Sequence, residues 1–390
     1  MRGVRYRSDR SMHSPSLCRR STACGLTVVA LTFLALLNLS PSDILSRVTS
    51  PPHVSPLILL EEYSQREKQF QGAPTVSATH LIMVPCHGTF SGTDGVAQGF
   101  NEAYWSLEPF QRGTDGLLIY SFASHIKVAL EMLAEDVEDS IVVFSGGATK
   151  NSGGGTRSEA QSYFIVAESY NFFGVFNFSS GGGDADQPEV KKKSDDDGIR
   201  NRPLLEKRSS NSEMIRTMLR QRITTEDFSR DSYENVLFSI ARFYELTGKY
   251  PQRYSVVGYA YKRERFETVH FPSIRFPLRQ VRYVGIDLID VVTKHLNLLH
   301  YITTFTGGQG NVEHWKNLAR PGRIRRLSDN KTLDAARSDP YECSVNKVTR
   351  RNRNPHRHVP SYFISCVQLR ALLVWCGPQL FTGSLPWDPV

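Results

Sequence analysis

The chain has 390 residues, 40% of them hydrophobic, which is enough for one large core or for one domain with attachments. Its net charge is +8, and residues 316–358 account for all of it, with 12 Lys/Arg against 4 Asp/Glu. No zinc-finger, helix-turn-helix or RNA-binding pattern accompanies this basic segment, so nucleic acid is not the expected partner. The segment is expected to be solvated, and docking on anionic lipid stays open.

The N-terminal 39 residues predict a membrane segment. Residues 1–22 form a basic tail with six arginines and one acid, and residues 23–39 form an apolar run. A membrane span takes about 20 residues, so this run is short for one. The positive-inside rule favours a signal-anchor, with the tail in the cytosol and the rest in the secretory pathway (ER/Golgi). A mitochondrial leader, also rich in Arg and Ser, and a cleaved signal peptide are the alternatives.

A polar, proline-rich stem follows at residues 40–78, and then apolar strands alternate with helices. Strands are expected at 80–86, 140–147, 223–227, 253–260 and 281–288, and helices at 120–139, 158–170, 231–247 and 261–271. This alternation predicts an α/β fold with a mostly parallel sheet of about five strands and helices on both faces. The domain is expected to span residues 79–306.

Two segments do not fit the alternating pattern. Residues 177–213 are glycine-rich and charged, which predicts a disordered insert. Residues 307–333 predict an irregular linker, and residues 334–390 a C-terminal extension. Cys366 and Cys376 of this extension are a possible disulfide pair, although sequence alone does not fix the connectivity.

The ligand crevice of such a sheet lies outside the carboxyl ends of the strands. Gly146 and Gly147 follow one buried strand and allow close backbone approach by a ligand. Ser158 starts the next helix in capping-box register with Gln161, and the helix N-terminus favours an anion. The competing interpretation is an ordinary turn between strand and helix.

Other polar residues follow the remaining strands. They are candidates for orienting polar groups (Asp231 and Asn235), for binding phosphate or carboxylate (Lys262 and Arg265), and for moving a proton (His87 and Glu159). A capped helix with a solvated face, a solvated basic helix and a structural histidine are the alternatives. No metal-ligand signature, Walker loop or G-x-G-x-x-G motif is present, so no metal is expected and the cofactor stays unknown.

The segments "IVVFSGGATK" with "SEAQSYF", "TTEDFSRDSYENVLFSIARF" and "VVGYAYKRERFETVH" resemble the family called domain of unknown function 218, which includes SanA-like envelope proteins. The resemblance covers about residues 79–290 and is nearest to a fungal branch with "PCHG" at residues 85–88 and a C-terminal extension. It implies a Rossmann-like fold and nucleotide-type ligands such as S-adenosylmethionine, without a shared reaction.

Two functions are expected from these observations. The first is a membrane-anchored α/β protein whose crevice binds an anionic, nucleotide-like small molecule, as a transferase or hydrolase. The alternative is a non-enzymatic, membrane-associated factor that docks on lipid or a protein partner through the basic C-terminal segment. Whether the protein is an enzyme, and its oligomeric state, stay undecided at this level.

Overall fold

The structure is a computed structural model, and it describes residues 76–389 except for 113–115, 151–154, 177–218, 220, 306–329 and 344–346. The expected basic tail, the signal-anchor at 23–39, the insert, and most of the stem and linker lie outside the described residues. Every described residue belongs to one compact unit, Tyr63–Val390.

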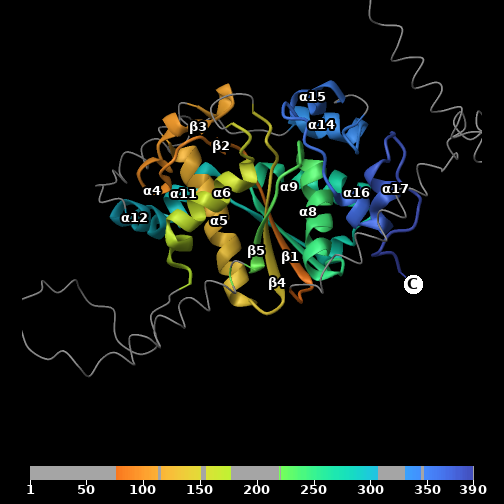
Figure 1. Ribbon diagram of the computed structural model, residues 1–390, viewed down its shortest axis with the longest axis horizontal. Helices are drawn as coiled ribbons and strands as arrows, with labels where there is room; N and C mark the ends of the chain where they lie inside the picture. Colours follow the sequence, from red (N-terminus) through yellow and green to blue (C-terminus); the bar gives the residue numbers. More distant parts are fainter. Residues whose placement is uncertain are drawn as a thin grey trace, which may run out of the picture. The chain divides into compact units, whose positions relative to one another are not determined.

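Five parallel strands form the central sheet, in the spatial order β5-β4-β1-β6-β7 (Figure 1). Their bounds are β1 His80–Pro85, β4 Ser140–Ser145, β5 Ile223–Glu226, β6 Arg253–Gly258 and β7 Val281–Gly285. The predicted fold class, a Rossmann-like α/β fold with a mostly parallel sheet of about five strands, is confirmed. The chain builds outward from β1 in both directions, so the strand order reverses between β1 and β6.

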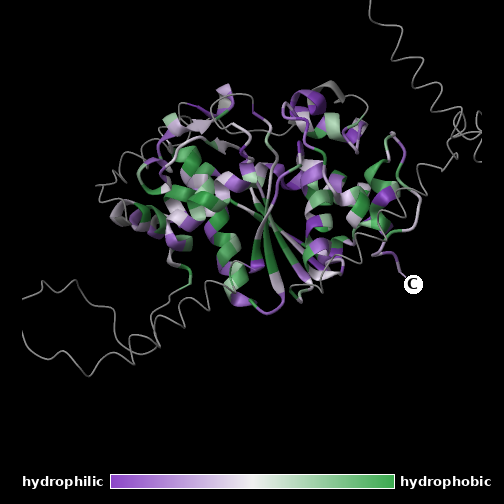
Figure 2. Cartoon of the chain, viewed as in Figure 1, coloured by the Kyte–Doolittle hydropathy of each residue, from purple (hydrophilic) through white to green (hydrophobic). Residues whose placement is uncertain are grey.

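Side chains alternate between the two faces of the sheet, as a pleated strand requires. In β1, Ile82 and Val84 pack into one hydrophobic core, and Leu81 and Met83 pack into the other. Figure 2 shows the central strands as largely hydrophobic. Burial on both faces explains why the strands read as continuous apolar runs in the sequence.

Four helices contribute to the first core: α5 Leu117–Glu135, α6 Glu159–Ser169, α11 Leu288–Lys294 and α12 Leu296–Phe305. The predicted capping box of α6 is confirmed, because Ser158 Oγ accepts from the Gln161 amide at 2.8 Å and the Gln161 side chain accepts from the Ser158 amide. Short elements lie between β1 and α5: β2 Thr89–Phe90, α4 Gly95–Gln98, η1 Glu102–Tyr104, β3 Trp105–Ser106 and η2 Pro109–Gln111. Another, η3 Asn171–Gly174, follows α6.

The second core is covered by α8 Ser232–Thr247 and by a helical stretch after β6. Val236, Leu237 and Ile240 of α8 are buried there, as their helical spacing predicts. The stretch after β6 consists of η4 Ala260–Lys262, α9 Arg263–Arg265, the π-helix η5 Phe266–His270 and α10 Phe271–Ser273, and η6 Leu278–Gln280 precedes β7.

The C-terminal segment packs onto this second core through Tyr362, Leu369 and Leu372. Its elements are α14 Asn330–Ser338, α15 Lys347–Asn352, α16 Tyr362–Ser365, η7 Val367–Leu369 and α17 Arg370–Leu373. A disulfide joins Cys343 to Cys376, so the pairing of Cys366 with Cys376 considered from the sequence is wrong. Cys366 is a buried free thiol whose Sγ lies 3.5 Å from the Ala241 carbonyl oxygen.

Helix α5 has the length and apolar composition of a membrane span, alone among the helices of the described residues. However, 78% of its apolar window is buried inside the protein. Its side chains fill the first core against the sheet, which is the place of a core helix in an α/β fold.

Candidate functional site

The reversal of strand order between β1 and β6 marks the place where open α/β sheets generally bind ligands. His87 follows β1, and Tyr259 and Lys262 follow β6, so the two loops meet at this point. The His87 ring stacks on Tyr259 with centroids 5.0 Å apart, and Lys262 Nζ lies 3.5 Å from His87 Nδ1. The structure therefore brings together two predicted site residues, His87 and Lys262.

The electrostatic surroundings keep His87 neutral. Burial lowers its pKa well below the usual value, and the charge of Lys262 acts in the same direction. Its Nε2 atom is buried and has no hydrogen-bond partner among the described residues. Because an ammonium group can only donate, Nδ1 is the acceptor and the neutral ring carries its proton on Nε2, which can donate a hydrogen bond to a ligand.

The Gly146–Gly147 turn serves backbone packing. A Cβ on Gly146 would lie 2.9 Å from the Cβ atoms of both Cys86 and Glu159, so only glycine fits without displacing a neighbour. The amide of Gly146 donates to the Glu226 carbonyl at 3.0 Å, and that of Gly147 donates to the Ser229 carbonyl at 2.7 Å. Both amides are thus engaged within the protein, and an anion at this edge would need other donors.

Glu159 is the first residue of α6 and lies beside this turn. Its side chain accepts a hydrogen bond from Thr149 Oγ1 at 2.8 Å and is buried. Burial raises the pKa of the carboxyl group, and the opposing charges of Lys150, Arg353 and Lys262 limit the rise. A buried acid faced by cations at the switch point can exchange a proton with a bound anion. Ser158, its neighbour, also donates to Asp227.

A second buried carboxylate, Glu226 at the end of β5, was not among the predicted site residues. It accepts from Ser145 Oγ at 2.8 Å, from the Phe228 amide at 2.8 Å and from the Tyr362 hydroxyl at 3.3 Å. Burial raises its pKa to about 7. The signal in the sequence was an acid in the predicted strand 223–227, shortly before the predicted helix start at Asp231.

Asn235 joins this internal network. Its Oδ1 lies 3.0 Å from Ser145 Oγ, the hydroxyl group whose single proton is shared between Glu226 and Asn235. The Asn235 side chain was predicted to orient a ligand group, but in this structure the residue is buried. Asn235 and Glu226 together fix the serine that precedes the glycine turn.

Asp231 caps α8 and pairs with an arginine from the C-terminal segment. One carboxylate oxygen accepts from the Glu234 amide at 2.8 Å, and the other accepts from Arg350 Nε at 2.5 Å. Arg350 also lies 3.6 Å from Glu234, which pairs with Arg230. The partner of Asp231 was not predicted, because nothing local in the sequence shows where the C-terminal segment packs.

Arg265, the other predicted cationic ligand, is buried, whereas Arg263 two residues earlier is exposed. The charge of Arg265 contributes to the lowered pKa of both His87 and His270. Within the described ranges, no group of three His, Cys, Asp or Glu side chains has the arrangement of a metal site.

Five of the predicted site residues thus form two groups at one edge of the sheet. His87, Lys262 and Glu159 lie around the ends of β1, β4 and β6. Asp231 and Asn235 are buried around the end of β5 and the start of α8.

The chain is similar to an uncharacterised protein of Saccharomyces cerevisiae, YOR238W. The two are 29% identical over 295 residues, which cover 72% of this chain and 86% of the yeast protein. No family model matches the chain, and no solved structure matches it. An uncharacterised fungal relative thus extends over most of the chain.

Proposed function

We propose that the protein binds an anionic small molecule of the nucleotide class in the crevice between β1 and β6, and acts on it as a hydrolase or transferase. The observation that carries this proposal is the grouping of His87, Glu159 and Lys262 at the point where the strand order reverses. A neutral hydrogen-bond donor, one buried acid and a cation are side chains that can bind a phosphate or carboxylate group and protonate a leaving group.

The three side chains have separate roles in this proposal. Lys262, with Lys150 nearby, neutralises the anion, because an ammonium group is a compact partner for phosphate. His87 donates a hydrogen bond to the bound anion from Nε2, because its Nδ1 faces the Lys262 ammonium group and the ring proton is therefore on Nε2. Glu159, with its raised pKa, supplies a proton to the leaving group. The stacked pair Tyr259 and Tyr261, 5.2 Å apart, places aromatic surface next to the cation.

A thermal-shift series on the full chain tests ligand binding with ATP, UDP-glucose, S-adenosylmethionine and inorganic phosphate. At 100 times Kd, a ligand stabilises the folded protein by about 2.7 kcal/mol. Lys262→Gln should abolish the shift, whereas Arg263→Gln, which removes the same charge from an exposed neighbour, should retain it. Absence of a shift with every probe would remove the proposal.

A second function has one observation in its favour. The C-terminal segment exposes Val359, Val374 and Leu380, with exposed fractions of 82%, 65% and 52%, in a chain region that also carries exposed arginines. Apolar and cationic side chains together favour a membrane-docking factor that has no enzyme activity. Sedimentation with phosphatidylserine vesicles, compared with phosphatidylcholine vesicles, separates this function from the first.

The proposal also includes the family to which the protein belongs and its location in the cell. We also propose, on the motifs quoted above, that the chain is a distant member of domain of unknown function 218, and that segment 23–39 anchors it as a single-pass membrane protein. The disulfide between Cys343 and Cys376 favours the lumen of the secretory pathway, because disulfides persist in oxidising compartments.

A further inference from the structure

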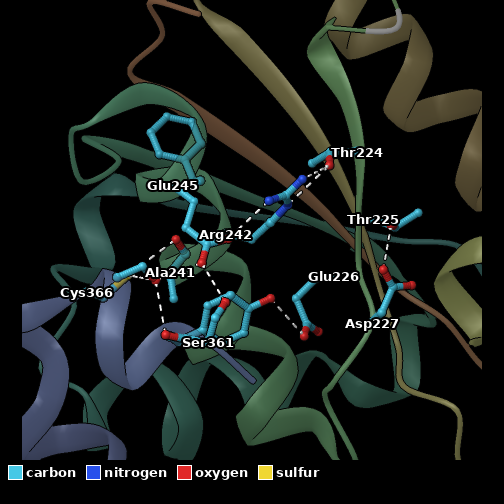
Figure 3. A network of polar contacts seen from close by, with 12 residues as sticks. Thr224, Thr225, Glu226, Asp227, Ala241, Arg242, Glu245, Ser361 and Cys366 are labelled. Atoms are coloured by element: carbon cyan, nitrogen blue, oxygen red, sulfur yellow. Dashed lines mark hydrogen bonds and ion pairs between the residues drawn. The ribbon is translucent and has the colours of Figure 1, made fainter. Parts of the chain in front are cut away.

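The part of the C-terminal segment enclosed by the disulfide covers the α8 side of the candidate site. Cys343 and Cys376 are 33 residues apart, and the loop between them contains α15, α16, η7 and α17. Figure 3 shows how this loop meets α8: Ser361 donates to Glu245 at 3.0 Å, and Cys366 lies against the Ala241 carbonyl. We call Cys343 together with residues 347–376 the clamp.

The clamp holds the loop that follows β5. The Tyr362 hydroxyl reaches Glu226, and the Tyr362 ring packs edge-on against Phe228 at 5.8 Å between centroids. Arg353 donates to the Arg230 carbonyl at 2.9 Å. Residues 226–230 are therefore in contact with the clamp at both of their ends and in the middle.

The same loop touches the candidate site from its other side. The Ser229 carbonyl accepts from the Gly147 amide at 2.7 Å, and Asp227 accepts from Ser158 Oγ. Glu159 follows Ser158 directly, so a shift of the loop would move the start of α6 and its acid. The loop is thus a mechanical link between the clamp and the crevice.

The clamp also supplies the charge that the buried acids need. Arg350 Nε lies 2.5 Å from Asp231 and 3.6 Å from Glu234, and the side chains are 13%, 4% and 4% exposed. Burial raises the pKa of Glu234, and the neighbouring charge of Asp231 raises it further. Without Arg350, two buried carboxylates would share Arg230 as their main partner, which favours local opening at the start of α8.

We propose that the clamp is a redox-sensitive device that positions the crevice, closed while Cys343 and Cys376 are joined and loosened when they are reduced. Arg350 and Tyr362 are its positioning residues, acting through Asp231 and Glu226. Cys376 is solvent-exposed, so a thiol reductant can reach the bond. The effect on ligand binding rests on the function proposed above, whereas the opening of the clamp does not.

The chemical step is thiol–disulfide exchange with a dithiol. One thiolate of the dithiol attacks a sulfur of the Cys343–Cys376 bond and forms a mixed disulfide, and its second thiol then closes the dithiol into its own disulfide. Two electrons and two protons pass to the protein, and both cysteines become thiols.

Hydrogen exchange on the folded full chain tests the clamp, before and after treatment with dithiothreitol. We expect amide protection in residues 226–235 to fall about tenfold or more on reduction. Cys376→Ser should show the weakened protection without reductant. Cys366→Ser, which removes a buried thiol of the clamp but leaves the disulfide, should respond to dithiothreitol as the wild type does. Unchanged protection after confirmed reduction would overturn the proposal.

A charge-matched pair of variants tests Arg350 separately. Arg350→Gln should lower the protection of residues 226–235 in the oxidised protein, and Arg351→Gln, at an exposed position of the same helix, should not. Equal effects of the two variants would contradict the positioning role.

The thermal shift with ATP, UDP-glucose, S-adenosylmethionine and inorganic phosphate, measured on the same oxidised and reduced samples, completes the test. A shift in the oxidised form that is lost on reduction supports both proposals. If exchange responds to reduction and no sample shows a shift, the clamp stands and ligand binding fails. If the shift survives reduction unchanged, the link between clamp and crevice is wrong.

Discussion

Glu226 is a carboxylate buried at the end of a strand, and its position makes folding stability depend on pH. Burial raises its pKa from 4.5 to about 7 in the folded protein. The folded state therefore binds the proton more tightly than the unfolded chain does. The stabilising contribution is complete below pH 4.5 and is lost as the pH rises through about 7.

Glu226→Gln removes this dependence. Between pH 4.5 and 8, the free energy of unfolding of the wild type should fall by about 3 kcal/mol more than that of the variant. Urea denaturation at a series of pH values measures the difference. Glu131→Gln, a change at a half-exposed surface carboxylate, is the control and should follow the wild type. Parallel curves for Glu226→Gln and wild type would show that Glu226 titrates as it does in the unfolded chain.

Gly146 is constrained by close packing on two sides. Gly146→Ala puts a Cβ 2.9 Å from Cys86 and Glu159, and such overpacking costs about 1–3 kcal/mol. Gly377→Ala meets no atom within 4 Å and should leave stability nearly unchanged. Chemical denaturation of the two variants checks this contrast. A stable Gly146→Ala protein would mean that Glu159 moves away at little cost.

At the level of single residues, the sequence predicted where the turn and cap residues lie better than it predicted which groups the polar side chains contact. The glycine turn and the cap at Ser158 follow from local chemistry, and both lie where they were expected. The roles depended on partners far along the chain. Asn235 faces Ser145, and Asp231 meets Arg350 at a separation of 119 residues, which no local pattern reveals.

At the level of elements, the cap of α6 joins helix stability to the geometry of the site. Ser158 Oγ accepts from the Gln161 amide and donates to Asp227, so Ser158→Ala removes two contacts. We expect a loss of about 1 kcal/mol in the free energy of unfolding. Thr156→Ala, at an exposed position two residues earlier, should change stability by less than about 0.5 kcal/mol. Equal losses in the two variants would show that the cap contributes little.

The central strands could be predicted from their continuous apolar runs, and α5, α6 and α8 from helical spacing or from clear start and end signals. Gly248, in the left-handed region with φ 65°, ends α8 after Thr247, as the sequence indicates. The short helices of the C-terminal segment lack such periods. They are held by the disulfide and by packing on α8, which are tertiary constraints that propensity does not contain.

At the level of the whole molecule, alternation of strands and helices was sufficient to predict a parallel sheet, because consecutive parallel strands need a crossover helix. The alternation did not predict the order of the strands in the sheet. That order is what places the candidate site between β1 and β6. The polar loops after the strands meet at one edge of the sheet because all five strands run in the same direction. Which of those loops adjoin each other follows only from the order β5-β4-β1-β6-β7.

The proposed lumenal location predicts a covalent mark on the C-terminal segment. Asn330-Lys331-Thr332 is a glycosylation sequon at the start of α14, and Lys331 and Thr332 are exposed. In a fungal host, the full-length protein should gain electrophoretic mobility after treatment with peptide-N-glycosidase F, and this change should diminish in Asn330→Gln. A second sequon, Asn177-Phe178-Ser179, lies outside the described residues and can be removed with Asn177→Gln. Two results together would show instead that the C-terminal segment faces the cytosol. The double variant and the wild type would migrate alike, and Cys343 would react with maleimide in a lysate prepared without reductant.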